Sequence, residues 1–132
     1  VKQIIGNKKK IISKIETLNA VRDLKNISKV SSSLLIDRGD LSRYIPIEEI
    51  PFAQEMIIKN ANNFKIPVFV ATNLLETMVT QKSPTRAESN DIYSTLKQGA
   101  KGLVLAAETA IGSYPLDCIK FLRKCIKIYK KN

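Results

Sequence analysis

Hydrophobic and polar positions follow one plan that occurs four times along this chain. In each copy, a short apolar run leads through a turn into a segment whose apolar residues recur every three or four positions. Short apolar runs that alternate with helical segments predict βαβ units and a parallel sheet. The runs expected to form strands are residues 11–16, 33–36, 67–71 and 102–106.

The segments between the runs predict the helices. The expected helical residues are 20–27, 47–63, 74–79, 87–98 and 115–130. The last three strands are almost entirely apolar, which is typical of strands covered on both faces. In the last helix one apolar stripe faces inward and lysines surround it, so we expect it to pack on the sheet. The stripe consists of Ile119, Leu122, Ile126 and Tyr129.

Local signals predict where several helices begin and end. Residues 85–88, Thr-Arg-Ala-Glu, have the form of a capping box, and residues 73–76, Asn-Leu-Leu-Glu, have the same form. Pro115 suits the first turn of the last helix, where a missing N–H has no cost. Gly99 suits the end of the third helical unit.

The length of 132 residues suits a single domain, residues 1–132. Hydrophobic residues make up 44% and charged residues 26%, both ordinary for a globular protein. No apolar run approaches the length of a membrane span, so no membrane contact is expected. Cys118 and Cys125 lie seven apart, which is not a zinc or redox spacing, and we expect buried thiols in a reducing compartment. Without a secretory signal, the expected location is cytoplasmic.

The net charge of +10 has two interpretations. It fits a partner that carries phosphates, and it also fits lysines scattered over a solvated surface, which we favour. Basic residues cluster at 8–10 and 120–131, but no aromatic side chains interleave with them as single-strand recognition requires. Nucleic-acid binding is therefore the weaker interpretation.

Polar residues follow each predicted strand. Lys14 and Glu16 end the first run, Asp40 follows the second, Thr72 the third and Glu108 the fourth. In parallel α/β folds, ligands bind beyond the carboxyl ends of the strands, so these groups are expected at one rim. A simple Lys14–Glu16 ion pair and a helix-capping role for Thr72 remain open alternatives.

The polar residues of this rim suit a cation and an anion together. The chain has no histidine, and two carboxylates at neighbouring strand ends, Glu16 and Asp40, favour Mg²⁺ or Mn²⁺ over zinc. Gly39 lets the backbone approach a ligand closely, and its N–H is a candidate anion donor. The hydroxyl of Thr72 is a second candidate donor to the same anion.

Five short sequence motifs resemble those of the pyruvate kinase family and occur in the same order along the chain. They are Ile-Ile-Ser-Lys-Ile-Glu (11–16), Arg-Gly-Asp-Leu (38–41), Ala-Thr-Asn-Leu-Leu-Glu-Thr-Met (71–78), Pro-Thr-Arg-Ala-Glu (84–88) and Glu-Thr-Ala-Ile-Gly-Ser-Tyr-Pro (108–115). The resemblance covers essentially the whole chain. It implies an α/β fold, the (β/α)4 half of a TIM (β/α)8 barrel with parallel strands, corresponding to strands five to eight.

The same resemblance implies roles for the rim residues. Lys14 would be the catalytic lysine that stabilises the enolate and the moving phosphoryl group. Glu16 and Asp40 would bind Mg²⁺ or Mn²⁺, and the amides of Gly39 and Asp40 with the Thr72 hydroxyl would hold the carboxylate of phosphoenolpyruvate or pyruvate. The implied reaction is the glycolytic phosphoryl transfer between phosphoenolpyruvate and ADP, giving pyruvate and ATP. Positioning and positive charge are what such a transfer requires.

The chain also departs from the family pattern. The family's first four barrel strands, its lid domain and its C-terminal domain have no counterpart in this sequence. The family's K⁺ ligands and most of its nucleotide contacts lie in those parts. Ala106-Ala107 stands where Ser-Gly is usual, and the acid Asp37 stands where a small residue is common. Asn73, Ser42 and Tyr44 are further departures.

These departures leave a second interpretation open. The chain is either the lysine, metal and carboxylate-binding half of an enzyme, or a divergent non-catalytic module that binds a metal–carboxylate ligand or a protein partner. A half barrel has two open sheet edges, so we expect a homo-oligomer or pairing with the missing half-barrel.

Overall fold

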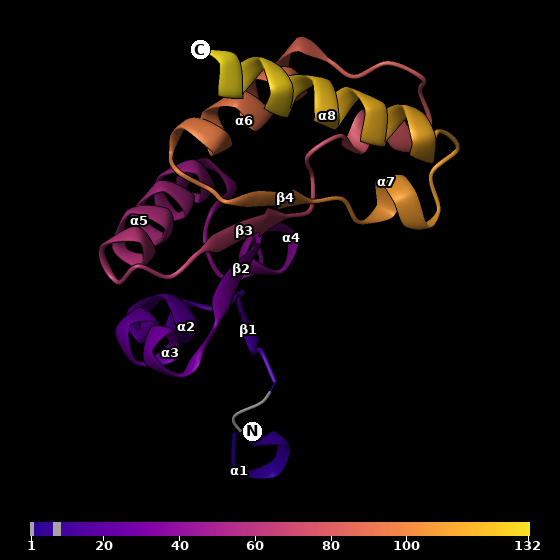
Figure 1. Ribbon diagram of the computed structural model, residues 1–132. Coiled ribbons are helices and arrows are strands. Elements are labelled where there is room, and N and C mark those ends of the chain that lie inside the picture. Colours follow the sequence, from indigo (N-terminus) through magenta and orange to yellow (C-terminus); the bar gives the residue numbers. More distant parts are fainter. Residues whose placement is uncertain (1, 7–8) are drawn as a thin grey trace.

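A parallel four-stranded sheet organises the computed structural model, which describes residues 2–6 and 9–132 (Figure 1). Its strands are β1 (Ile12–Ile15), β2 (Ser33–Asp37), β3 (Val68–Ala71) and β4 (Gly102–Val104), hydrogen-bonded in the order β1-β2-β3-β4. All four predicted strands are present, and each is followed by helical residues. The α/β class with a parallel sheet is confirmed, and the topology is that of part of a β/α barrel.

Helical segments come after each strand in the sequence. The helices are α1 (Lys2–Ile5), α2 (Leu18–Arg22), α3 (Leu24–Val30), α4 (Arg38–Leu41), α5 (Ile50–Asn63), α6 (Arg86–Lys97), α7 (Ala107–Ala110) and α8 (Pro115–Lys131), with 3-10 turns η1 (Ile47–Glu49) and η2 (Glu76–Val79). Two predictions need correction. Residues 20–27 form parts of two short helices separated at Asp23, and residues 74–79 contain only the short turn η2. Lys8 of the basic cluster lies outside the described residues.

Three of the four predicted helix ends are confirmed. Thr85 and Glu88 form the capping box: the Thr85 hydroxyl accepts from the Glu88 amide, and the Glu88 carboxylate accepts from the Thr85 amide. Gly99 ends α6 in the left-handed region with φ of 105°, and Pro115 lies in the first turn of α8. The second capping box is wrong, since the side-chain amide of Asn73 donates to the Glu76 carboxylate and η2 starts only at Glu76.

The two faces of the sheet differ in cover. One face is covered by α3 and α5, and its buried strand residues belong to the first hydrophobic core: Ile15, Leu34, Ile36, Val68 and Val70. The other face is open, so that Ile12 is 58% and Val104 38% exposed. The expectation of strands covered on both faces is therefore wrong. The open face is the one that the opposite strands of a closed barrel would cover.

A second hydrophobic core lies between η2, α6 and α8. Leu74, Met78, Ile92, Cys118 and Leu122 are buried in it. The helix α8 therefore packs mainly on α6 and α7 instead of on the sheet (Figure 1). Its buried stripe starts from Cys118 instead of the predicted Ile119, which is 43% exposed.

Both cysteines are free, and they lie on the inner side of α8. Cys118 is buried and Cys125 partly buried, and burial raises the pKa of both thiols. These positions agree with the predicted buried thiols. Within residues 2–6 and 9–132, no helix is both long enough and apolar enough to cross a bilayer.

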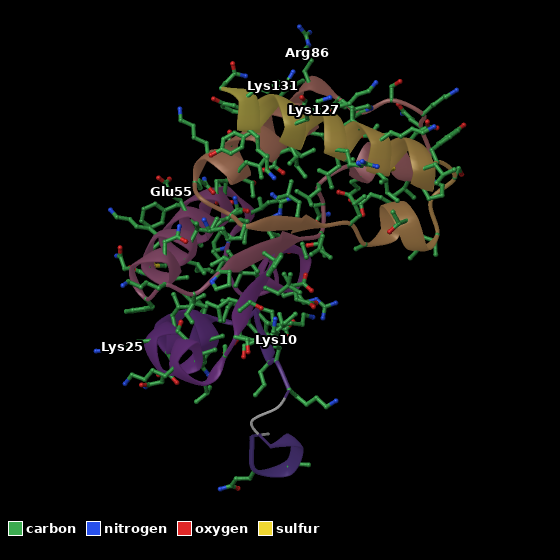
Figure 2. All side chains as sticks on the ribbon, viewed as in Figure 1. Lys10, Lys25, Glu55, Arg86, Lys127 and Lys131 are labelled. Atoms are coloured by element: carbon green, nitrogen blue, oxygen red, sulfur yellow. The ribbon has the colours of Figure 1, made fainter. Side chains whose placement is uncertain are left out.

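The basic side chains are spread over several elements. Figure 2 shows Lys25 of α3 on one side of the molecule, and Arg86 and Lys131 at the other end. The basic residues are therefore spread over the molecule, and those of the predicted cluster at 120–131 also line a groove along α8.

Candidate functional site

Lys14 lies on the open face of the sheet because side chains alternate along β1. Ile15 turns into the buried core, and Glu16 returns to the same side as Lys14 just after the strand ends. The ammonium of Lys14 lies 2.6 Å from the Glu16 carboxylate, 3.0 Å from that of Asp37 and 3.4 Å from that of Asp40. The structure therefore brings the predicted lysine and both predicted metal ligands together.

Asp40 reaches this cluster from the short helix α4, directly after β2. The helix begins because the Asp37 side chain accepts a hydrogen bond from the Asp40 amide, at 3.3 Å. The exposed Arg43 approaches the other side of Asp40, at 3.8 Å. Asp40 is thus fixed through its backbone while its carboxylate faces Lys14.

Thr72 and Gly39 meet across the end of β3. The Gly39 amide donates to the Thr72 hydroxyl oxygen at 2.8 Å, so this predicted anion donor already has an acceptor. The Thr72 hydroxyl has two acceptors within reach, the Ala71 carbonyl at 2.6 Å and the Asp37 carboxylate at 3.3 Å. Thr72 does not cap a helix.

The turn at Thr72 is strained. Thr72 and Asn73 have φ values of 69° and 53°, in the left-handed region that a β-branched residue rarely adopts. The guanidinium of Arg38, only 9% exposed, donates to both carbonyls of this turn, at 2.7 Å to Thr72 and 2.9 Å to Asn73. The same guanidinium binds both carboxylate oxygens of Asp91 on α6, at 2.7 and 2.9 Å. Arg38 therefore holds the strained turn against the sheet.

The carboxylates of this cluster fit a hard divalent cation. Glu16, Asp37 and Asp40 each offer one oxygen, and these oxygens lie within 4.8 Å of one another. The Glu16 Oε2 atom is shielded from solvent and has no hydrogen-bond partner, only its ionic contact with Lys14. Three carboxylate oxygens grouped in this way fit Mg²⁺ or Mn²⁺, in competition with the Lys14 ammonium.

Charge contacts shift two pKa values in opposite directions. The contacts with Glu16 and then Asp37 raise the pKa of Lys14. Partial burial alone would raise the pKa of Asp37, but the hydrogen bonds from Lys14 and from the Asp40 amide outweigh it and lower that pKa. Both groups are therefore charged at neutral pH, and they form an ion pair.

Two residues of the site were not among those that the sequence singled out for binding: Asp37 and Arg38. The expectation that Glu108 lies at the rim with the other polar groups is wrong, because its carboxylate is buried. Asp37 was noted only as a departure from the family pattern, although the strand register gives a usable signal. Lys14 pairs with Leu35, and Asp37 lies two residues further along the same face. No comparable signal marks Arg38, whose partners lie 16 to 53 residues away.

The fourth strand contributes differently from the other three. Glu108 is 2% exposed and turns inward, where its carboxylate accepts from the amides of Leu75 and Ala106 at 3.0 and 2.8 Å. It therefore supports the backbone beside the site. A cavity of about 270 Å³ lies next to it at the rim. That cavity is lined by Gly39, Thr72, Asn73, Glu76, Val79, Ala106, Ala107 and Glu108.

A larger groove, about 460 Å³, lies along α8 and away from these groups. It is lined by Arg123, Lys124, Ile126, Lys127, Lys130 and Lys131. Its basic side chains offer an anion a surface, but the lining contains no carboxylate that could bind a metal. The cluster of Lys14 and the three acids lies elsewhere, at the strand ends.

Comparison with known proteins places the chain within one family. The sequence model described as "Pyruvate kinase, barrel domain" matches residues 1–119. The chain is 47% identical to a pyruvate kinase of Thermotoga maritima over 126 residues, which are 96% of this chain and 27% of that protein. It is 36% identical over 131 residues to a pyruvate kinase of Agrobacterium vitis, covering 99% of this chain and 27% of that protein. The chain is also 42% identical over 112 residues to a chloroplastic pyruvate kinase isozyme G of Nicotiana tabacum, covering 85% of this chain and 20% of that protein.

The chain therefore spans about a quarter of the length of these relatives.

Proposed function

Since this chain belongs to the pyruvate kinase family, we propose that it supplies the lysine, metal and carboxylate-binding half of an active site for phosphoryl transfer between phosphoenolpyruvate and ADP. One observation carries the proposal: Lys14 lies within 3.4 Å of the carboxylates of Glu16 and Asp40 at the carboxyl ends of the strands. An ammonium and a metal site on one rim offer the positive charge that such a transfer needs.

In the proposed reaction, the bond between phosphorus and the enol oxygen breaks while a bond forms from phosphorus to an oxygen of ADP. Lys14 stabilises the negative charge that develops on the enol oxygen and on the moving phosphoryl group. Glu16 and Asp40 would hold Mg²⁺ or Mn²⁺, and the cation would supply further positive charge for the transfer. Ala106 and Ala107 carry no hydroxyl, so the proton that completes pyruvate comes from water or from another part of the protein.

The binding roles of the remaining predicted residues belong to the same proposal. Thr72, Gly39 and the Asp40 amide would orient the substrate carboxylate, which must displace Asp37 from the Thr72 hydroxyl and the Asp40 amide. The nucleotide contacts and the K⁺ ligands would come from the part of the relatives that this chain does not match. A cytoplasmic location remains a prediction.

A chimaera tests the proposed function. Replacing the matching 126 residues of the Thermotoga maritima protein with this chain should give pyruvate formation in a coupled assay with Mg²⁺, K⁺ and ADP. Lys14→Met in the chimaera should lower kcat by at least about 100-fold, because a charge that stabilises the transition state is lost. Lys101→Met, an exposed lysine at the opposite end of the sheet, should leave kcat nearly unchanged. A folded chimaera that is as inactive as its Lys14→Met version would contradict the proposal.

A second function is favoured by one specific observation. Asp37 already accepts from two of the three donors that the reaction assigns to substrate, and this suits a non-catalytic module that binds a divalent cation or a protein partner. Mn²⁺ binding by the chain, without pyruvate formation by the chimaera, would support this second function over the first.

We further propose that the chain self-associates through its open sheet. The edges β1 and β4 have unpaired backbone groups, and the open face exposes Ile12 and Val104. We expect sedimentation velocity to show dimers or larger species that become more abundant with concentration. Val104→Lys should shift the chain toward monomer, whereas Leu116→Lys on α8, also exposed, should not. A single monomeric species at every concentration would exclude this association.

A further inference from the structure

We propose that Asp37 acts as a built-in competitor for the anion-binding donors of this site, and thereby determines which ligands the site accepts. The inference rests on the proposed function, because it concerns the same donors. It assigns Asp37 a role in ligand selectivity, beside the carboxylate oxygen that Asp37 offers to the cation cluster.

The contacts of Asp37 carry the inference. One carboxylate oxygen, Oδ1, lies 3.3 Å from the Asp40 amide nitrogen and 3.3 Å from the Thr72 hydroxyl oxygen. The other, Oδ2, lies 3.0 Å from the ammonium of Lys14. A single carboxylate thus spans the distance from the amide and hydroxyl donors to the lysine. A ligand that bound the donors with a carboxylate and Lys14 with a second oxygen would make the same contacts.

Burial distinguishes Asp37 from the other two acids of the cluster. The Asp37 side chain is 13% exposed, against 35% for Glu16 and 38% for Asp40. It is the last residue of β2, and its backbone is held in register with Ala71 of β3. Because the strand fixes its position, Asp37 remains beside the donors unless its side chain changes rotamer. A ligand carboxylate must therefore displace it.

The net charge of the cluster also opposes the binding of an anionic ligand. Lys14 contributes one positive charge and the three acids contribute three negative charges, so these four groups together are doubly negative. An anionic ligand therefore meets both an occupied set of donors and a repulsive field. Removal of Asp37 relieves both effects, whereas removal of Glu16 relieves only the second. This difference allows the two effects to be measured separately.

Oxalate, a dicarboxylate, is a suitable probe for the experiment. We would titrate it into the ¹⁵N-labelled chain without metal, and follow the amide resonances of Gly39 and Asp40. Asp37→Ala should bind oxalate at least about tenfold more tightly than the unmodified chain, since the Asp40 amide and the Thr72 hydroxyl lose the carboxylate that competes for them. Asp37→Gly is the second variant, because glycine is better tolerated than alanine at the start of a helix. Glu16→Ala removes the same charge and is the matched control.

The outcomes separate the two effects. A gain in the Asp37 variants that exceeds the gain in Glu16→Ala supports the inference. Equal gains in both show that charge alone acts, and no gain in the Asp37 variants shows that the donors do not bind carboxylates; either result overturns it. A parallel Mn²⁺ titration of the unmodified chain keeps the proposed function separate. If Mn²⁺ does not bind, the metal site proposed at Glu16 and Asp40 fails, while the metal-free oxalate result decides the role of Asp37 independently.

Discussion

Arg38→Ala should lower the free energy of unfolding by roughly 3 kcal/mol, the lower end of the cost of leaving a buried charge unpaired. Arg38 is 9% exposed, and its guanidinium joins three separate segments: α4, the turn after β3, and α6. Removing it leaves the Asp91 carboxylate and the Thr72 carbonyl without their donor. We take the lower end because the Asp91 side chain is 34% exposed and partly recovers water.

Urea denaturation followed by circular dichroism measures this change. Arg43→Ala is the matched control, because Arg43 lies on the same segment with 76% of its side chain exposed, and its loss should change stability by no more than about 0.5 kcal/mol. A double variant, Arg38→Ala with Asp91→Ala, identifies the source of the loss. If stability stays low in the double variant, the strained Thr72 turn accounts for it. Similar stabilities of Arg38→Ala and Arg43→Ala would contradict this role of Arg38.

Lys14→Met should tighten Mn²⁺ binding by roughly tenfold, while it abolishes the activity of the chimaera. The ammonium lies within 3.4 Å of all three acids, so it occupies the position that a divalent cation requires. Without it, the three carboxylates face one another and the cation no longer competes with a fixed charge. A tenfold change is a modest effect for one unit charge at this distance, as expected where solvent screens the interaction.

Electron paramagnetic resonance of free Mn²⁺ gives the dissociation constant. Lys10→Met is the control, because Lys10 is exposed and lies outside the cluster. Equal affinities of Lys14→Met and the unmodified chain would show that the ammonium does not compete. A weaker affinity would show instead that Lys14 is needed to hold the acids in place.

The sequence alone predicted those features that depend on short-range backbone geometry. Alternation along the first run placed Lys14 and Glu16 on one side of a strand, because successive side chains point to opposite faces. The box at Thr85 and Glu88 and the left-handed Gly99 followed from which residues satisfy free backbone groups at helix ends. The parallel sheet followed from the alternation of strands and helices, since such units pair in only a few ways.

The tertiary structure decided which polar groups bind one another. In the sequence, Asp37 was only a departure from the family pattern, yet the register of β1 with β2 places it beside Lys14. Glu108 appeared at a strand end like Glu16, yet it turns inward because the Leu75 and Ala106 amides need an acceptor there. The physical reason is the range of each interaction. Hydrophobic periodicity and capping act within a few residues, whereas the partner of a buried charge is chosen by the packing of distant segments.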